Sequence, residues 1–299
     1  MDRNLRFKKI AALFMCVFML CGCNVQKKEN TKLSIVTTLF PQYDFARQVS
    51  GDKADVSLLL PPGVEAHAYE PSAADIVKIS ECDMFIYTGD SMEPWAKKLI
   101  DSGEIHGTVI NLTEGVTLDN ESDGDPDPHV WTDPQYADEM VRKIADALCT
   151  ADSANAEVYK ENADDYRNSI KKLDEDFKAC VDAAPHKEMV FGTKFSLHYF
   201  TKRYGISHLA AFDSCGEETE PSVKVMTELI EAVKVNSLKY VWYGELESTK
   251  TAEAIANETG AMTIKFHSCH NVTKSEFDAG ETYVSLMTKN LDALRKGLY

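Results

Sequence analysis

Short β-rich runs and longer segments with helical spacing alternate along the chain from Lys32 to about Asn111. The strand-like runs in this part are KLSIVTT, DVSLLL, MFIYTG and TVINL. After Lys187 the same alternation resumes with EMVFG, ISHLAAF, KYVWYG and MTIKF, and a terminal helix is expected from about Ala279. Strands and helices in strict alternation predict parallel sheets with crossover helices. We therefore expect an α/β protein with two lobes, at residues 32–146 and 186–299.

The segment between the lobes has a different pattern. It contains no Gly or Pro from Ala151 to Ala184, and its apolar residues recur at alternating steps of four and three. These residues are Tyr159, Ala163, Tyr166, Ile170, Leu173, Phe177 and Cys180. The stripe predicts a long amphipathic helix, on the order of 50 Å at a rise of about 1.5 Å per residue. We expect residues 147–185 to form one rigid backbone helix that joins the lobes; a coiled-coil segment is the alternative.

The N-terminus predicts export. MDRNLRFKK is a charged region, and the eleven apolar residues of IAALFMCVFML are too few to span a bilayer as a mature helix. Leu20-Cys21-Gly22-Cys23 resembles a bacterial lipobox. We expect residues 1–22 to be a lipoprotein signal peptide, Cys23 to carry the lipid and residues 23–31 to be a tether. The protein would then be extracytoplasmic and lipid-anchored to the bacterial cell membrane; an uncleaved anchor or a plain signal peptide is the alternative.

Charge narrows the choice of partners. Residues 1–22 contain four basic residues and one acidic residue, so their removal changes the formal charge from −16 to −19. Such an acidic chain is a poor ligand for nucleic acid.

Five cysteines remain after Cys23, and no CxxC pattern is present, so neither a zinc knuckle nor a thioredoxin-type motif is expected. Because five is an odd number, at least one of these cysteines should be unpaired.

Three of the eight histidines lie where a binding crevice is expected. His67 lies in PPGVEAHAYEPSAAD after a strand-like run, and His267 follows MTIKF in the other lobe. Loops after parallel strands meet at the binding edge of an α/β sheet. His129 lies in DPDPHVWTDP, where residues before proline are kept out of helix and form a rigid loop. Each could instead be an ordinary surface histidine, and HSCH at 267–270 could form a small local site.

Two of these motifs carry a family resemblance. PPGVEAHAYEPSAAD resembles the PPG-x-x-x-H-x-Y-E-P-S motif of the solute-binding lipoproteins of zinc and manganese ABC importers, the family of ZnuA, TroA and PsaA. DPHVWTDP resembles that family's second ligand motif, and TKRYG at 201–205 resembles its Tyr-Gly signature. The resemblance implies two lobes, a backbone helix, a metal site in the interlobe cleft, and His67 and His129 as ligands.

The C-terminal lobe departs from the family pattern. The resemblance places Lys194 at the usual third-ligand position, five residues before Tyr199, and a lysine ammonium cannot ligate a metal. His198 would lie one helical turn away from that position. His267-Ser268 matches the Asp-Ser pair that carries the family's fourth ligand. We therefore expect a metal site of His67, His129 and His267.

The fourth position of this site stays open from the sequence. Water, a carboxylate, His198 and Cys215 are the candidates. Cys215 and Cys269 both follow strand-like runs, so a disulfide between them is preferred over a thiolate ligand.

A set of imidazoles suits four-coordinate Zn²⁺, whereas Mn²⁺ prefers more oxygen ligands. Asp127, in an acidic run with Asp123 and Asp125, is the residue that could shift the site toward oxygen. The reference imidazole pKa of about 6.5 predicts that binding weakens as the pH falls through about 6. We expect a monomeric, non-enzymatic subunit that delivers Zn²⁺, or alternatively Mn²⁺, to an ABC permease and its ATPase, with the lipid as its only membrane contact.

A zinc-dependent hydrolase and a surface adhesin are the alternative functional classes. A zinc-dependent hydrolase also uses three protein ligands and an open position. The chain contains no HExxH, GxSxG or P-loop motif, which argues against that class. A surface adhesin on the same fold has no discriminating feature in the sequence.

Overall fold

The structure is a computed structural model that describes residues 32–120, 124–213 and 220–299. The expected signal peptide, the tether with Cys23, and Cys215 lie outside the described residues. Within the described ranges, we find no helix with the length and apolar character that crossing a bilayer requires.

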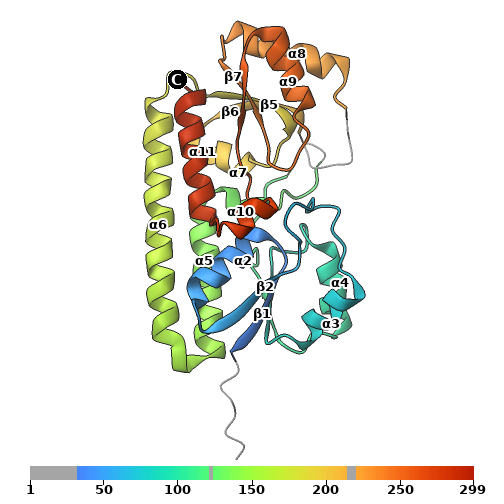
Figure 1. Cartoon of the computed structure of the whole chain (residues 1–299), viewed down its shortest axis with the longest axis vertical. Helices are drawn as coiled ribbons and strands as arrows, with labels where there is room; N and C mark the ends of the chain where they lie inside the picture. Colours follow the sequence, from blue (N-terminus) through green and yellow to red (C-terminus); the bar gives the residue numbers. More distant parts are fainter. Residues whose placement is uncertain (1–31, 121–123, 214–219) are drawn as a thin grey trace, which may run out of the picture. The chain divides into compact units, whose positions relative to one another are not determined.

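The N-terminal lobe contains a four-stranded parallel sheet in the order β2-β1-β3-β4. Each strand is connected to the next through a crossover helix, as the alternating pattern predicts (Figure 1). Its strands are β1 (Leu33–Thr37), β2 (Ala54–Leu58), β3 (Met84–Tyr87) and β4 (Thr108–Asn111). Its helices are α2 (Phe40–Ser50), α3 (Ala73–Glu81) and α4 (Pro94–Ser102).

The C-terminal lobe repeats this arrangement with the order β6-β5-β7-β8, again parallel throughout. Its strands are β5 (Glu188–Lys194), β6 (Ser207–Phe212), β7 (Tyr240–Tyr243) and β8 (Met262–Lys265). Its helices are α7 (His198–Tyr204), α8 (Val223–Val235), α9 (Lys250–Thr259), α10 (Lys274–Asp278) and α11 (Tyr283–Gly297). The predicted class, two α/β lobes with parallel sheets, is confirmed.

Two long helices connect the lobes, where the sequence predicted one. A short 3-10 turn (η1, Val130–Thr132) leads into α5 (Pro134–Ala151), and a second turn (η2, Ser153–Asn155) separates α5 from α6 (Ala156–Ala183). The predicted stripe is the buried face of α6, which packs against α5 and α11 (Figure 1). The expected helix over 147–185 therefore begins later, because the chain reverses at Asp152, whose carboxylate accepts hydrogen bonds from Asn155 and Tyr159.

One continuous apolar core extends from the first sheet, across α5 and α6, to the second sheet and α11. The β3 strand is buried along its whole length, as strands covered by helices on both faces should be. This shared core fixes the positions of the loops that leave the carboxyl ends of both sheets.

Both sheets reverse their strand order at a central pair of strands, β1 and β3 in one and β5 and β7 in the other. Ligands of open α/β sheets bind outside the carboxyl ends of the strands at such a point. His67 follows β2, His129 follows β4, Lys194 ends β5, and His270 follows β8. The fold therefore delivers these side chains from the carboxyl ends of four different strands.

Candidate metal centre

His67 lies in an exposed turn after β2. The carboxylate of Glu65 accepts hydrogen bonds from the backbone N–H of His67 at 3.0 Å and of Ala68 at 2.8 Å. These bonds fold the chain back on itself and direct the imidazole inward. The turn therefore defines the position of His67.

His129 is fully buried just before η1. One oxygen of Asp127 accepts hydrogen bonds from the backbone N–H of His129 at 2.8 Å and from its Nδ1 at 2.6 Å. Burial alone would raise the pKa of Asp127, but the bonds from His129 outweigh it and hold that pKa below its usual value. A carboxylate at Nδ1 fixes the proton there and leaves the lone pair on Nε2, as is usual for histidine metal ligands.

His270 lies at the end of the loop that follows β8. Its Nδ1 is 2.5 Å from the hydroxyl of Ser268, and its Nε2 is buried without a hydrogen-bond partner among the described residues. Between the two, Cys269 has a φ of +66°, a conformation that non-glycine residues rarely adopt. A buried nitrogen without a partner is costly unless a ligand satisfies it.

The three imidazoles converge on one point. The Nε2 atoms of His67 and His129 are 3.3 Å apart, and each of the three rings offers a ligand atom within 4.8 Å of the other two. Two nitrogens that bind one Zn²⁺ tetrahedrally at about 2.0–2.1 Å are about 3.3–3.4 Å apart. The observed separation fits a shared ion, because two neutral imidazoles facing each other through lone pairs otherwise repel.

The electrostatics of the centre keep the rings of His67 and His270 neutral. Although its turn is exposed, the imidazole of His67 faces the rings of His129 and His270, and the loss of water around it, together with the charge of His129, lowers its pKa to about 4. Burial, followed by the repulsion from His129 and His67, holds the pKa of His270 well below its usual value. Near pH 7 the rings of His67 and His270 are therefore neutral and present lone pairs, which is the form that binds a metal.

A cavity of about 110 Å³ opens beside His67 and His270. Both lobes contribute to its wall, including the carboxylates of Glu65, Glu245 and Glu247 and the side chain of Lys194. The backbone N–H of Lys194 donates to Glu247 at 3.1 Å. The cavity provides the open coordination position with both acidic and basic neighbours.

Comparison with known proteins identifies the family. Residues 35–297 match the family described as zinc-uptake complex component A, periplasmic (ZnuA). The chain belongs to this family. Because the match covers nearly all of the described residues, both lobes and the long helices between them are features of the ZnuA fold.

Several members of the ZnuA family resemble this chain closely. The zinc-binding lipoprotein AdcA of Streptococcus pneumoniae is 34% identical over 97% of this chain, which spans only 61% of that relative's length. The high-affinity zinc uptake system protein ZnuA of Bacillus subtilis is 31% identical over 98% of both chains. The solved Zn(II)-bound ZnuA-like domain of S. pneumoniae AdcA has a TM-score of 0.79 at 34% identity and covers 89% of this chain and 99% of its own.

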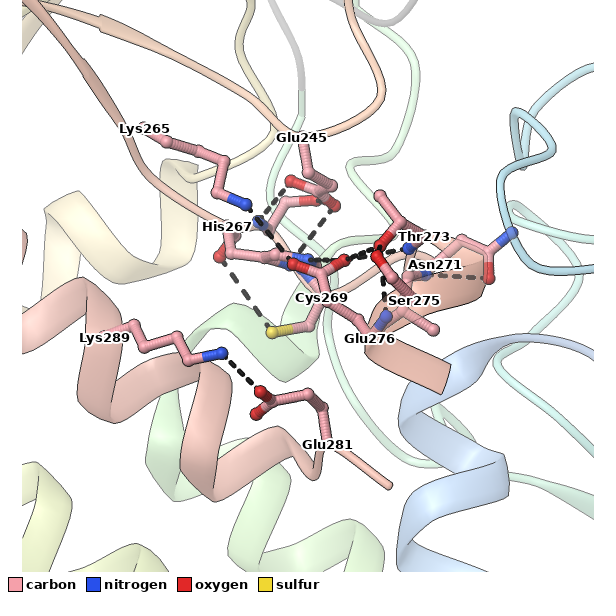
Figure 2. Close-up of polar contacts among 12 residues, drawn as sticks. Glu245, Lys265, His267, Cys269, Asn271, Thr273, Ser275, Glu276, Glu281 and Lys289 are labelled. Carbon is pink, nitrogen blue, oxygen red and sulfur yellow. Dashed lines mark hydrogen bonds and ion pairs between the residues drawn. The ribbon is translucent and has the colours of Figure 1, made fainter. Parts of the chain in front are cut away.

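His267 is not among the three histidines whose ligand atoms converge, in contrast to the sequence-based expectation. Asn290 of α11 accepts from the N–H of His267 and donates to its carbonyl, both at 2.7 Å. Nδ1 of His267 accepts from the N–H of Cys269 at 2.9 Å, and the ring lies beside Glu245 and Glu276 (Figure 2). The strand end was predicted correctly, but the turn at Cys269 directs His270 to the centre instead. The second histidine of the HSCH motif, His270, was the sequence feature that could have indicated this ligand.

The sequence analysis placed Lys194 and His198 on one helix, but the two residues lie in different elements. Lys194 is the last residue of β5, and α7 begins only at His198. His198 Nε2 lies 3.5 Å from a carboxylate oxygen of Asp119, and the ring lines a different cavity. His198 therefore does not contribute to the candidate metal centre.

Cys269 is fully buried with a free thiol. The expected disulfide with Cys215 stays a prediction, because Cys215 lies outside the described residues. Burial raises the pKa of the Cys269 thiol well above its usual value, so it stays protonated. The thiol is therefore a packing group beneath the loop of His270.

The loops that carry His67 and His270 are bonded directly to each other. The side-chain amide of Asn271 donates to the carbonyls of Pro61 at 2.8 Å and Val64 at 2.9 Å. The N–H of Gly63 donates to the carbonyl of Val272 at 2.8 Å. This seam, formed by Asn271 and Val272 against residues 61–64, joins the two lobes next to the metal centre.

Proposed function

We propose that this protein captures Zn²⁺ outside the cytoplasm and delivers it to the permease and ATPase of an ABC importer. The observation that carries the proposal is the convergence of three imidazoles with lone pairs on one point. Membership of the ZnuA family and the zinc named for its relatives support the metal and the transport role.

His67, His129 and His270 are the proposed ligands, with His270 in place of His267. Water, or the carboxylate of Glu65 in the adjoining cavity, takes the fourth position. Asp127 is bound to Nδ1 of His129 and so supports a ligand. The resulting nitrogen-rich set favours Zn²⁺ over Mn²⁺, whose sites are richer in oxygen. The proposed form is a lipid-anchored monomer that is not an enzyme.

Isothermal titration calorimetry of residues 23–299 tests the proposal. We expect one Zn²⁺ per chain and a larger rise in melting temperature with Zn²⁺ than with equimolar Mn²⁺. His67→Ala and His129→Ala should each weaken binding by more than about 100-fold, since changes even to residues behind a ligand cost about 10- to 100-fold. His106→Ala, at an exposed histidine, is the matched control and should bind like the parent.

Equal or greater stabilisation by Mn²⁺ would contradict the choice of zinc. Unchanged affinity in both ligand variants would contradict the site itself. Hydrolysis of a panel of esters and phosphoesters that depends on zinc would contradict the transport role.

A further inference from the structure

The hydroxyl of Ser268 lies between a buried carboxylate and His270. Glu245, in the loop after β7, accepts from the backbone N–H of Ser268 at 2.6 Å and from its hydroxyl at 2.5 Å. The same hydroxyl is 2.5 Å from Nδ1 of His270 and 3.4 Å from the N–H of that residue. Glu245 is only 8% exposed and lies above the loop of His267 and Cys269 (Figure 2).

The protons in this chain of bonds can be assigned. A serine hydroxyl has one proton and two lone pairs. Its proton goes to Glu245, because a carboxylate can only accept. Both lone pairs are then left for His270, one for its backbone N–H and one for Nδ1. The hydroxyl is fully satisfied only if Nδ1 of His270 carries a proton.

A neutral imidazole with its proton on Nδ1 has its lone pair on Nε2. Nε2 of His270 is the buried atom without a hydrogen-bond partner among the residues described. The ring is therefore held in the tautomer that offers a lone pair to the centre shared with His67 and His129.

We propose that Glu245 and Ser268 are positioning residues that act together to hold His270 in its metal-binding tautomer. The inference rests on the proposed function only for the identity of the ion. His129 receives the same support from Asp127 directly, whereas His270 receives it through one hydroxyl. Glu245 touches no metal in this arrangement and acts only through Ser268.

The variant Glu245→Gln gives a specific test. Glutamine has the shape of glutamate, but one of the two acceptor oxygens is replaced by a donor NH2 group. The amide oxygen must face the N–H of Ser268, so the amide nitrogen takes the place of the oxygen that accepts from the hydroxyl. The hydroxyl then accepts from the amide and donates to His270. Nδ1 becomes the acceptor, and the proton moves to Nε2, where it points at the metal centre.

The experiment is ¹⁵N NMR of the histidine side chains in the metal-free protein, with His270 assigned by the loss of its signals in His270→Gln. We expect a protonated Nδ1 and an unprotonated Nε2 in the parent and the reverse in Glu245→Gln. Zinc affinity of that variant should fall by about 10- to 100-fold, the usual cost of losing support behind a metal ligand. Ser268→Ala should release the ring into a mixture of tautomers with a smaller loss, and Ser268→Thr should restore the parent spectrum.

Glu247→Gln is the matched control. It makes the same exchange of a carboxyl group for an amide in the same loop without a bond to Ser268, and Glu247 accepts instead from the backbone of Lys194. His270 should keep the parent tautomer in this variant. A parent spectrum with the proton on Nε2, or an unchanged His270 in both Glu245→Gln and Ser268→Ala, would overturn the proposal.

The experiment distinguishes a failure of this proposal from a failure of the proposed zinc-capture function. The tautomer is read without any metal, so the expected spectra together with an absence of zinc binding would reject only the proposed function. Zinc binding by the parent with no change of tautomer in the variants would reject only the role of Glu245 and Ser268.

Discussion

The indole N–H of Trp131 donates to the backbone carbonyl of Ser268 at 2.8 Å. Trp131 is fully buried in η1, two residues after His129, and Ser268 lies two residues before His270. This bond therefore links the supports of two proposed ligands that come from different lobes.

Trp131→Phe should lower both stability and zinc affinity. The change leaves the carbonyl of Ser268 buried without its donor, which costs about 1–3 kcal/mol, and allows the loop of His270 to move. Urea unfolding and calorimetry measure the two effects. Trp95→Phe, in the half-buried start of α4, is the control and should retain zinc affinity; equal zinc affinity in Trp131→Phe and the parent would contradict the link.

His270→Ala and His267→Ala should have different effects, although the two residues are only three positions apart. We expect His270→Ala to weaken zinc binding by more than about 100-fold with little change in the apo melting temperature. His267→Ala removes the acceptor for the N–H of Cys269, so it should cost about 1–3 kcal/mol of stability and bind zinc more nearly like the parent. The opposite pattern in calorimetry and thermal melts would restore His267 as the ligand.

Lys194→Ala should retain zinc, because Lys194 lines the cavity and is not a proposed ligand. Burial is the main cause of the lowered pKa of His67, and the positive charge of Lys194 contributes to it. Lys194→His should tighten binding by placing a fourth imidazole at the cavity. A loss of binding in Lys194→Ala, measured by competition with a zinc chelator, would show that Lys194 has a direct role.

Zinc binding should persist to lower pH than the reference value for histidine predicts. Protons compete with the ion below the pKa of each ligand. Burial and His129 lower the pKa of His67 to about 4, and burial followed by the neighbouring histidines holds that of His270 well below its usual value. Affinity should therefore change little between pH 7 and about 5.5 and fall below about 5. A steep loss between pH 7 and 6 would show that the imidazoles titrate near their reference pKa.

Much of the fold could be predicted from the sequence, because the spacing of apolar residues within each strand and helix is a local feature. Alternating strand and helix patterns predicted both parallel sheets, and the stripe from Tyr159 to Cys180 predicted the buried face of α6. The boundary at Ala156 was missed because the turn before it contains neither Gly nor Pro. Its reversal is stabilised by the side chain of Asp152, which has no distinctive periodicity.

The site was predictable only where a motif fixes a side chain within its own loop. His67 and His129 lie in such motifs, and each is held by a carboxylate two residues away. The choice between His267 and His270 depends on Asn290 and Glu245, which are more than twenty residues distant in the chain. Such contacts leave no pattern near the histidines themselves.

The seam between Asn271 and the loop of His67 has a kinetic consequence. The loops of the proposed ligands His67 and His270 are bonded to each other through backbone carbonyls. The two ligands therefore cannot dissociate from a bound ion one after the other while the seam is intact. We expect the residence time of the ion to follow the rate at which these bonds open, and a docking partner that competes for the amide of Asn271 would shorten it.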